Sequence, residues 1–221
     1  MIKLSKPSKM PCPTWSLEAR ETCPGSIDPI TKKSVAVCEG CYAATGFYKM
    51  PDSMRVRAAN RKDWLRKEWV AEMIEAINNQ KVQRKYKDKQ KYFRWFDSGD
   101  VYHPHLADKI YEIMKATPEV KHWLPTRSHK IPRIKETLEK MKQLPNVAVR
   151  YSSDSIKGEH DDIHGSVVIP DHDYKIKAVK CEAYERDGKC GDCRACWNKE
   201  VDLIAYPSHG RKMKSILKEA A

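Results

Sequence analysis

The sequence predicts an α/β protein with a parallel sheet, arranged as a partial or six-stranded barrel or as an open sheet. From residue 91 onward, short apolar runs alternate with amphipathic helical patterns, which is typical of right-handed βαβ units. About six such runs are too few for a full eight-stranded barrel. The eight cysteines lie outside the region of clearest alternation, four toward each end of the chain.

One domain is expected for a chain of 221 residues. We divide it into a cysteine-rich N-terminal segment (residues 1–53), a βα core (residues 54–170) and a C-terminal segment (residues 171–221) with cysteines and the last strand. The N-terminal segment is predicted to be irregular, because prolines and glycines interrupt every periodic pattern in it. Such a segment needs support beyond a hydrophobic core, and a bound metal would supply it.

The core opens with a predicted helix from residue 54 to residue 78. Its apolar residues recur at helical spacing, which is the pattern of a helix packed on a core. The residues of this face are Leu65, Trp69, Val70, Met73, Ile74 and Ile77. The basic run that follows, from Lys81 to Lys91, is predicted to be a solvated linker.

Six strands and two helices are predicted after the linker. The strands cover residues 92–96, 121–125, 147–151, 167–169, 176–179 and 201–206. The first helix begins near residue 104, and its predicted buried residues are Leu106, Ile110, Ile113 and Met114. The second helix covers residues 131–144, and its predicted buried residues are Ile134, Leu138 and Met141.

Polar residues directly follow several of the predicted strands. In parallel α/β folds the carboxyl ends of the strands line the active site, so these residues are candidate catalytic residues. The alternative is that they are turn-formers and helix caps, because serine and aspartate favour those positions. We expect Arg127 to bind an anionic group, and the carboxylates to position or deprotonate a substrate. The candidates are Asp97, Ser98, Asp100, Arg127, Ser152 and Asp154.

The C-terminal cysteines form the stronger of two cysteine motifs, with the spacing C-x8-C-x2-C-x2-C. Two-residue turns point each thiolate inward, and bacterial ferredoxins hold iron–sulfur clusters with the same C-x2-C-x2-C spacing. Zinc sites more often pair two C-x2-C units across a longer loop. We therefore predict an iron–sulfur site, with zinc as the alternative, at Cys181, Cys190, Cys193 and Cys196.

The N-terminal cysteines are predicted to form a second metal site. Cys38 and Cys41 make a chelating C-x2-C pair, whereas Cys12 and Cys23 come from proline-containing loops. If all four bind, the site is closed and is structural or carries electrons. If only three bind, one iron is open to a substrate or to S-adenosylmethionine. The expected cofactors are thus two [4Fe-4S] clusters, with zinc as the alternative at one site.

The formal net charge of +12 suggests nucleic acid or another polyanion as a partner. The alternative is that lysine and arginine only solvate helix faces, since no DNA-binding or RNA-binding motif is present. No stretch of about 18 apolar residues predicts a membrane span, and the N-terminus does not resemble a secretory signal. We expect a cytoplasmic protein whose thiols bind metal rather than pair as disulfides.

Four elements, taken in order, resemble the phage gene product 88 family. They are the Cys-x2-Cys-Tyr-Ala run that starts at Cys38, the sequence Asp97-Ser98-Gly99-Asp100, the sequence Thr126-Arg127-Ser128 and the terminal C-x2-C-x2-C. The resemblance covers most of the chain. It implies kinship with the radical S-adenosylmethionine enzymes, and hence a partial, about six-stranded parallel TIM-like barrel with an iron–sulfur cluster near its mouth. It also implies residence in the host cell cytoplasm.

The chain departs from the radical enzymes at their cluster loop. Those enzymes carry C-x3-C-x2-C, and here Ser34 stands where the first of the three cysteines would be. Radical cleavage of S-adenosylmethionine is therefore not carried over. The first functional hypothesis is redox or radical-type chemistry at the barrel mouth, on a substrate that the sequence does not identify. The second is a basic nucleic-acid-binding protein in which zinc or iron–sulfur sites are structural and catalyse nothing. The third is a structural or host-interaction protein that zinc holds together and that has no catalytic chemistry.

Overall fold

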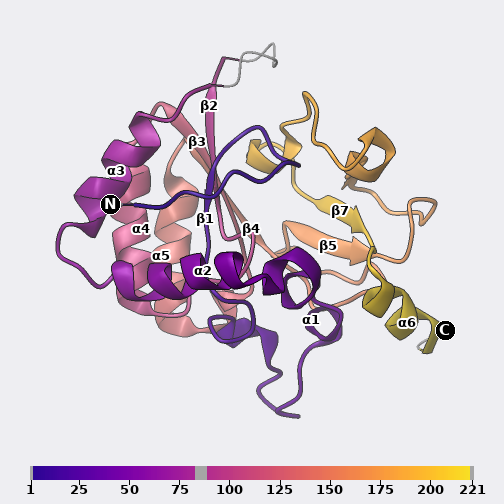
Figure 1. Ribbon diagram of the computed structural model, residues 1–221. Coiled ribbons are helices and arrows are strands. Elements are labelled where there is room, and N and C mark those ends of the chain that lie inside the picture. Colours follow the sequence, from indigo (N-terminus) through magenta and orange to yellow (C-terminus); the bar gives the residue numbers. More distant parts are fainter. Residues whose placement is uncertain (1, 83–88, 220–221) are drawn as a thin grey trace.

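The computed structural model describes residues 2–82 and 89–219, so residues 83–88 of the predicted basic linker lie outside the described chain. It contains a four-stranded parallel sheet of order β1-β2-β3-β4 and a three-stranded parallel sheet of order β5-β7-β6 (Figure 1). The strands are β1 (Thr14–Trp15), β2 (Lys91–Trp95), β3 (Val120–Thr126), β4 (Val147–Tyr151), β5 (Ser166–Ile169), β6 (Val179–Lys180) and β7 (Ile204–Pro207).

The sheets are open and do not close into a barrel. One parallel bridge between Ser152 and Ser166 joins the end of β4 to the start of β5, so the two sheets follow one another with all strands in one direction. The outermost strands, β1 and β6, have two residues each, and no pairing joins them in the described chain. The predicted parallel α/β class is confirmed, whereas a TIM-like barrel is not.

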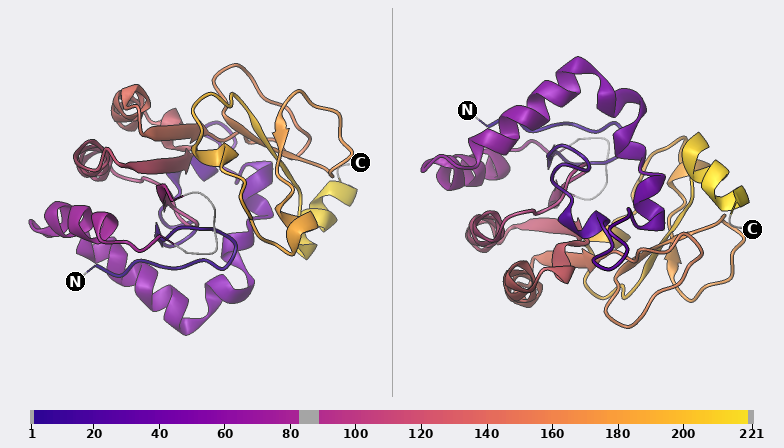
Figure 2. Two further views of the ribbon diagram at one scale, coloured as in Figure 1. Left: turned by 90° about the horizontal axis from the view of Figure 1, so that it is seen from above. Right: turned by 90° about the horizontal axis from the view of Figure 1, so that it is seen from below.

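Three helices lie side by side along one outer side of the molecule, while β5 and β7 lie on the opposite side (Figures 1 and 2). These three are α3, α4 and α5, and the remaining α-helices lie near the chain's cysteine-bearing segments or beside α3. The α-helices are α1 (Ala36–Glu39), α2 (Pro51–Asp63), α3 (Trp69–Asn78), α4 (Pro104–Ala116), α5 (Pro132–Gln143) and α6 (Arg211–Glu219).

The single helix predicted over residues 54–78 is two helices, α2 and α3, separated by a turn. Lys109 of α4 stabilises the break, because its ammonium donates to the carbonyls of Trp64 at 2.8 Å and of Arg66 at 3.1 Å. Arg66 also pairs with Glu72 across the turn. The turn changes the direction of the chain, so Leu65, which was predicted to be buried, is 65% exposed.

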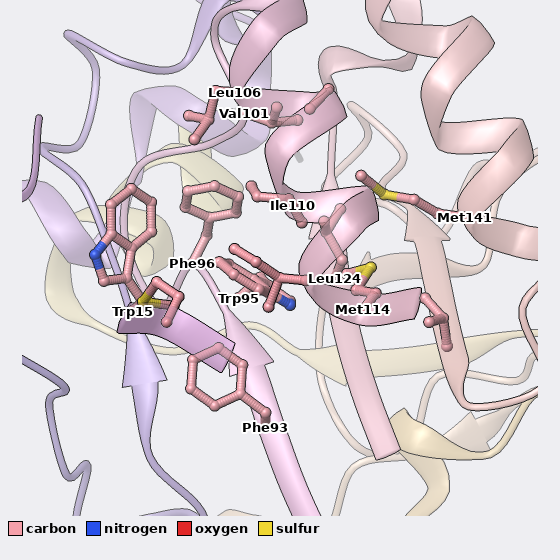
Figure 3. Packing of buried hydrophobic residues seen from close by; sticks show 14 of the residues in the cluster. Trp15, Phe93, Trp95, Phe96, Val101, Leu106, Ile110, Met114, Leu124 and Met141 are labelled. Atoms are coloured by element: carbon pink, nitrogen blue, oxygen red, sulfur yellow. The ribbon is translucent and has the colours of Figure 1, made fainter. Parts of the chain in front are cut away.

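The main hydrophobic core lies between the four-stranded sheet and the helices on its outer side (Figure 3). Phe93 and Trp95 of β2 point into it, since alternate residues of a strand face the same side. The residues predicted to be buried in α4 and α5 are all buried. The sequence pattern did not predict β1, yet its Trp15 is fully buried, with its ring 5.2 Å from that of Trp69.

The second face of this sheet is covered by irregular segments rather than by helices. Trp123 of β3 packs against Trp197, whose indole N–H donates to the Phe93 carbonyl at 3.0 Å. Met10 and Cys12 complete this smaller apolar cluster. Of the short 3-10 helices, η6 (Ala195–Trp197) contacts β3 and β4 on this face. The others are η1 (Pro24–Ser26), η2 (Tyr42–Ala44), η3 (Gly46–Lys49), η4 (Ser128–Lys130) and η5 (Ala183–Arg186).

None of the helices in the described chain has the length and apolar character needed to cross a lipid bilayer.

His122 makes the stability of this fold depend on pH. Its imidazole is fully buried, with Nε2 2.8 Å from Thr117 Oγ1 and Nδ1 3.3 Å from the Trp95 indole nitrogen. Burial lowers the pKa of His122 from 6.5 to about 3. Between these two values the unfolded chain binds a proton that the folded chain does not, so stability falls as the pH decreases through the window.

We expect acidification from about pH 6.5 to about pH 4 to lower the free energy of unfolding of both the native chain and His122→Gln. The loss should be larger in the native chain, by about 2–3 kcal/mol. Glutamine keeps a polar group at this position but does not titrate. Denaturant unfolding at several pH values measures the difference. Equal pH dependence of the two proteins would show that the buried imidazole is not the cause.

Candidate functional site

The four C-terminal cysteines line one hollow. Cys181, Cys190, Cys193 and Cys196 surround about 340 Å³ of space, part of it open to solvent, together with apolar residues such as Ala183, Trp197 and Ile204. Burial raises the pKa of Cys196 to about 12, while its sulfur lies 3.1 Å from the Tyr206 hydroxyl. None of the eight cysteines is in a disulfide. The set predicted from the C-terminal spacing is thus brought together by the fold.

Arg150 of β4 holds this segment against the sheet. Its side chain is almost fully buried, and its guanidinium donates to five backbone carbonyls rather than to a carboxylate. Four of the acceptors lie in the C-terminal segment, so one side chain fixes the chain path beside two of the cysteines. The acceptors are the carbonyl oxygens of Gly165, Ala195, Cys196, Asn198 and Val201, at 2.7 to 3.3 Å.

Cys12 does not lie with the other N-terminal cysteines. It is buried in the apolar cluster around Trp123, where Cys190 and Cys196 of the C-terminal set also pack. The N–H of Cys190 donates to the Lys9 carbonyl at 2.9 Å, which fixes the first loop to the C-terminal segment. Burial raises the pKa of Cys12 to about 12. The structure therefore places Cys12 beside the C-terminal cysteines, whereas its position in the sequence had grouped it with the N-terminal ones.

Cys23, Cys38 and Cys41 remain as an N-terminal group of three. Burial raises the pKa of Cys23 to about 12, and the nearby Asp100, Cys38 and Cys41 add to this effect. Cys38 and Cys41 lie at either end of one turn that starts in α1, where the N–H of Cys41 donates to the Cys38 carbonyl at 3.3 Å. Sequence-separated thiols thus converge on one small region.

This group lies at the carboxyl ends of the strands β2, β3 and β4. The N–H of Val37 donates to the Asp154 carbonyl at 3.2 Å, which attaches α1 to the loop after β4. Gly25 packs directly on the loop after β3, where a Cβ would lie 2.3 Å from the Arg127 carbonyl oxygen. Only glycine fits there, so this contact sets how close the Cys23 loop approaches the sheet.

Three of the six candidate catalytic residues have internal partners that favour the structural interpretation. Ser98 donates to the Leu17 carbonyl at 2.6 Å, and the Ser152 hydroxyl lies 3.0 Å from that of Ser166. Asp100 accepts three hydrogen bonds, from the Thr126 hydroxyl and from the N–H groups of residues 101 and 127. Burial raises the pKa of Asp100 in spite of these bonds. These side chains brace the loops that hold the cysteines.

The three charged candidates that remain are Asp97, Arg127 and Asp154. Arg127 and Asp154 lie near Cys38, and the Asp97 carbonyl accepts a hydrogen bond from Tyr42, which follows Cys41. Arg127 Nε lies 3.4 Å from Asp154 Oδ1, and its Nη2 donates to the Ser153 carbonyl at 2.8 Å. Arg127, Asp154 and Lys130 all influence the pKa of Cys38, which burial raises. Asp97 follows Phe96, whose φ of 56° is in the left-handed region. Its carboxylate accepts a hydrogen bond from the buried Ser16 hydroxyl and also faces Tyr48.

Sequence reasoning missed several residues around these carboxylates. Lys130 pairs with Asp154 and donates to the Gly25 carbonyl at 3.0 Å. Arg57 of α2 lies 3.9 Å from Asp97 and stacks on Tyr48. These residues carry no motif, because each belongs to a helix or turn whose ordinary composition includes such side chains. They can be recognised as part of the candidate site only from their positions in the folded protein.

The C-terminal helix α6 covers the turn between Cys38 and Cys41. Met213 is buried, and a Cβ on Gly40 would lie 2.6 Å from its terminal methyl group. Cys38 packs in the same apolar cluster, with Ile216 and Leu217 of α6. The amphipathic face of α6 is therefore used to shield the three-cysteine group from one side.

In the described residues, no three histidine, cysteine, aspartate or glutamate side chains are arranged to hold one metal ion. A zinc ion at about 2.3 Å from each sulfur needs the sulfurs almost in contact. A cluster binds each thiolate through a different iron, so its ligands stand farther apart. Four thiols line one hollow and three others lie near one another, and thiolates are ligands of both zinc and iron–sulfur sites.

Comparison with known proteins identifies a family. The family model of gene product 88 matches residues 2–199, which include all eight cysteines and end before β7 and α6. No curated protein and no solved structure matches the chain. The match bears out the phage family that the sequence elements resemble, and it does not extend to radical enzymes.

We expect Arg150→Met to lower the free energy of unfolding by about 3 kcal/mol or more, because buried carbonyls lose a charged donor. Amide hydrogen exchange over residues 195–201 should rise with it. The matched control is Arg133→Met on the exposed side of α5, which we expect to change stability by less than about 0.5 kcal/mol. Equal effects of the two substitutions would contradict the anchoring role of Arg150.

We expect Gly25→Ala to destabilise the protein by about 3 kcal/mol, because the added methyl group meets a backbone carbonyl that cannot move aside. Gly46→Ala is the control: its Cβ meets nothing within 4 Å, and its φ of 57° costs about 1 kcal/mol. Thermal or denaturant unfolding compares them. If Gly25→Ala lowered the stability less than Gly46→Ala does, this would contradict the close contact between the Cys23 loop and the end of β3.

Proposed function

The chain belongs to the gene product 88 family, and we propose that it is an iron–sulfur protein with two unequal cluster sites. One site is formed by Cys23, Cys38 and Cys41 at the carboxyl ends of the strands. The other is formed by the four C-terminal cysteines on the second face of the sheet. The observation that carries the proposal is the gathering of those four thiols around a single hollow, on a segment with little regular structure of its own.

The sites differ in the number of protein ligands. The C-terminal hollow has four thiols and so can close a cluster completely, which suits electron transfer or a structural role. The N-terminal group has three, because Cys12 is held in the other apolar cluster. A bound cluster supplies one-electron chemistry and, where one iron lacks a protein thiolate, a position for an exchangeable ligand.

The residues around the N-terminal group suit an anionic ligand or substrate. Arg127 and Lys130 place two cations beside Cys38, with Asp154 between them. Their positive charge offsets part of the charge of the thiolates, and a guanidinium binds carboxylate or phosphate oxygens in a fixed geometry. Asp97, held by Ser16, Tyr48 and Arg57, is the carboxylate that we assign to positioning or proton transfer.

We propose redox chemistry at this end of the sheet. Radical cleavage of S-adenosylmethionine is not part of the proposal, because the spacing C-x14-C-x2-C departs from the C-x3-C-x2-C loop of the radical enzymes. The proposal also does not include the partial barrel of those enzymes, because the sheets are open. The basic surface is compatible with a polyanionic substrate at the same site.

Anaerobic purification followed by iron, sulfide and zinc analysis tests the proposal. We expect about eight iron and about eight sulfide per chain, the content of two [4Fe-4S] clusters. Cys38→Ser and Cys196→Ser should each remove about half of both, because each breaks one site. Cys12→Ala is the matched control, and it should leave the iron content unchanged.

The outcomes separate the alternatives. Zinc without iron would contradict the proposal and favour a basic protein with structural metal sites. Loss of half of the iron in Cys12→Ala would show that Cys12 is a ligand, and would contradict the three-cysteine assignment.

A further inference from the structure

Arg94 lies between the two cysteine sites. It alternates with the core residues Phe93 and Trp95 in β2, and its side chain therefore projects to the face that the cysteine-bearing segments cover. Its guanidinium lies over the ring of Trp123, at 4.3 Å from the centroid. Nη1 lies 3.4 Å from the Met10 sulfur and Nη2 lies 3.5 Å from the Tyr42 hydroxyl.

This guanidinium has weak partners for a charged group. A thioether is a poor acceptor, and the contact with the phenol is at the limit of a hydrogen bond. Among the described residues, no carboxylate oxygen lies within the 4.0 Å of an ion pair, unlike the case of Arg57 beside Asp97. The Arg94 Nε is buried without a hydrogen-bond partner. A cation in such surroundings is costly unless a negative charge accompanies it.

Two kinds of group can supply that charge: the Asp97 carboxylate, which lies beyond ion-pair distance, and the nearby thiols once they bind a metal. The Trp123 ring beneath the Arg94 guanidinium packs in the same apolar cluster as Cys12, Cys190 and Cys196. As thiols these groups are neutral, and Cys190 becomes a thiolate when it binds a metal. Loading of the C-terminal site thus places thiolate charge close to Arg94, in addition to the more distant Asp97 carboxylate.

On the basis of the proposed function, we propose that Arg94 is the counter-ion of the C-terminal cluster and raises its reduction potential. A cluster held by four thiolates is negative and gains a further negative charge on reduction. A fixed cation on the partly buried sheet face stabilises the reduced form more than the oxidised form. Arg94 is a positioning and tuning residue in this role, and touches no substrate.

The same side chain reaches toward the N-terminal group through Tyr42, which follows Cys41. The Tyr42 hydroxyl also donates to the Asp97 carbonyl at 3.1 Å, and its ring packs on those of Tyr48 and His209. Tyr42 therefore keeps its place when Arg94 is replaced. We expect the effect of Arg94 to be greater on the C-terminal cluster than on the N-terminal one.

Redox titration of the full chain, followed by electron paramagnetic resonance under anaerobic conditions with dithionite as reductant, tests this role. The spectra of Cys38→Ser and Cys196→Ser assign the signals to the two sites. At the potential where half of the native C-terminal cluster is reduced, we expect Arg94→Met to lower the ratio of reduced to oxidised cluster about tenfold, which is about 59 mV for one electron. Arg94→Lys, which keeps the charge, should stay within about threefold of the native ratio.

Arg57→Met is the matched control, because Arg57 has its own carboxylate partner, and it should leave this ratio unchanged. An unchanged ratio in Arg94→Met, or an equal fall in Arg57→Met, would overturn the role of Arg94. If Arg94→Met does not retain the C-terminal cluster, iron content is the measurement: retention in Arg94→Lys supports the role, and equal loss there overturns it. Native protein without iron would contradict the proposed function itself.

Discussion

The contact between Arg150 and the backbone of the C-terminal segment is the constraint on which the arrangement of the cysteines depends. Helices cover one face of the four-stranded sheet and bury a large apolar core, but the other face is covered by segments with few regular hydrogen bonds. One buried guanidinium supplies donors for carbonyls that no helix or strand satisfies. The hollow lined by the four thiols exists because this segment is held in one path.

The parts of the fold that were predictable share strong periodicity. The strands β2 to β4 and the helices α4 and α5 have clear apolar patterns, and their buried residues follow from them. The break between α2 and α3 could not be predicted from an apolar pattern, because it is stabilised by Lys109, which belongs to a helix farther along the chain. The strand β1 has two residues and no alternation, and α6 is too short and basic to stand out.

The members of the candidate site were partly predictable from the sequence, and their grouping in space was less so. The C-x2-C-x2-C spacing identified a set of thiols that the fold does bring together. Proximity in sequence misplaced Cys12, because apolar packing beside Trp123 takes it to the other group. Ser98, Ser152 and Asp100 followed strands as active-site residues do, yet their hydrogen bonds are internal. Residues such as Lys130 and Arg94 depend on distant partners and leave no pattern in the sequence.

The proposal rests on two groups of thiols that the fold gathers, so the decisive observation is the metal itself. The most direct measurement is anomalous diffraction at the iron absorption edge from crystals of anaerobically purified protein. The account predicts two iron peaks, one bounded by Cys181, Cys190, Cys193 and Cys196, and one bounded by Cys23, Cys38 and Cys41 with Cys12 outside both. A single peak, a peak that takes Cys12 as a ligand of the N-terminal site, or zinc in place of iron would contradict it.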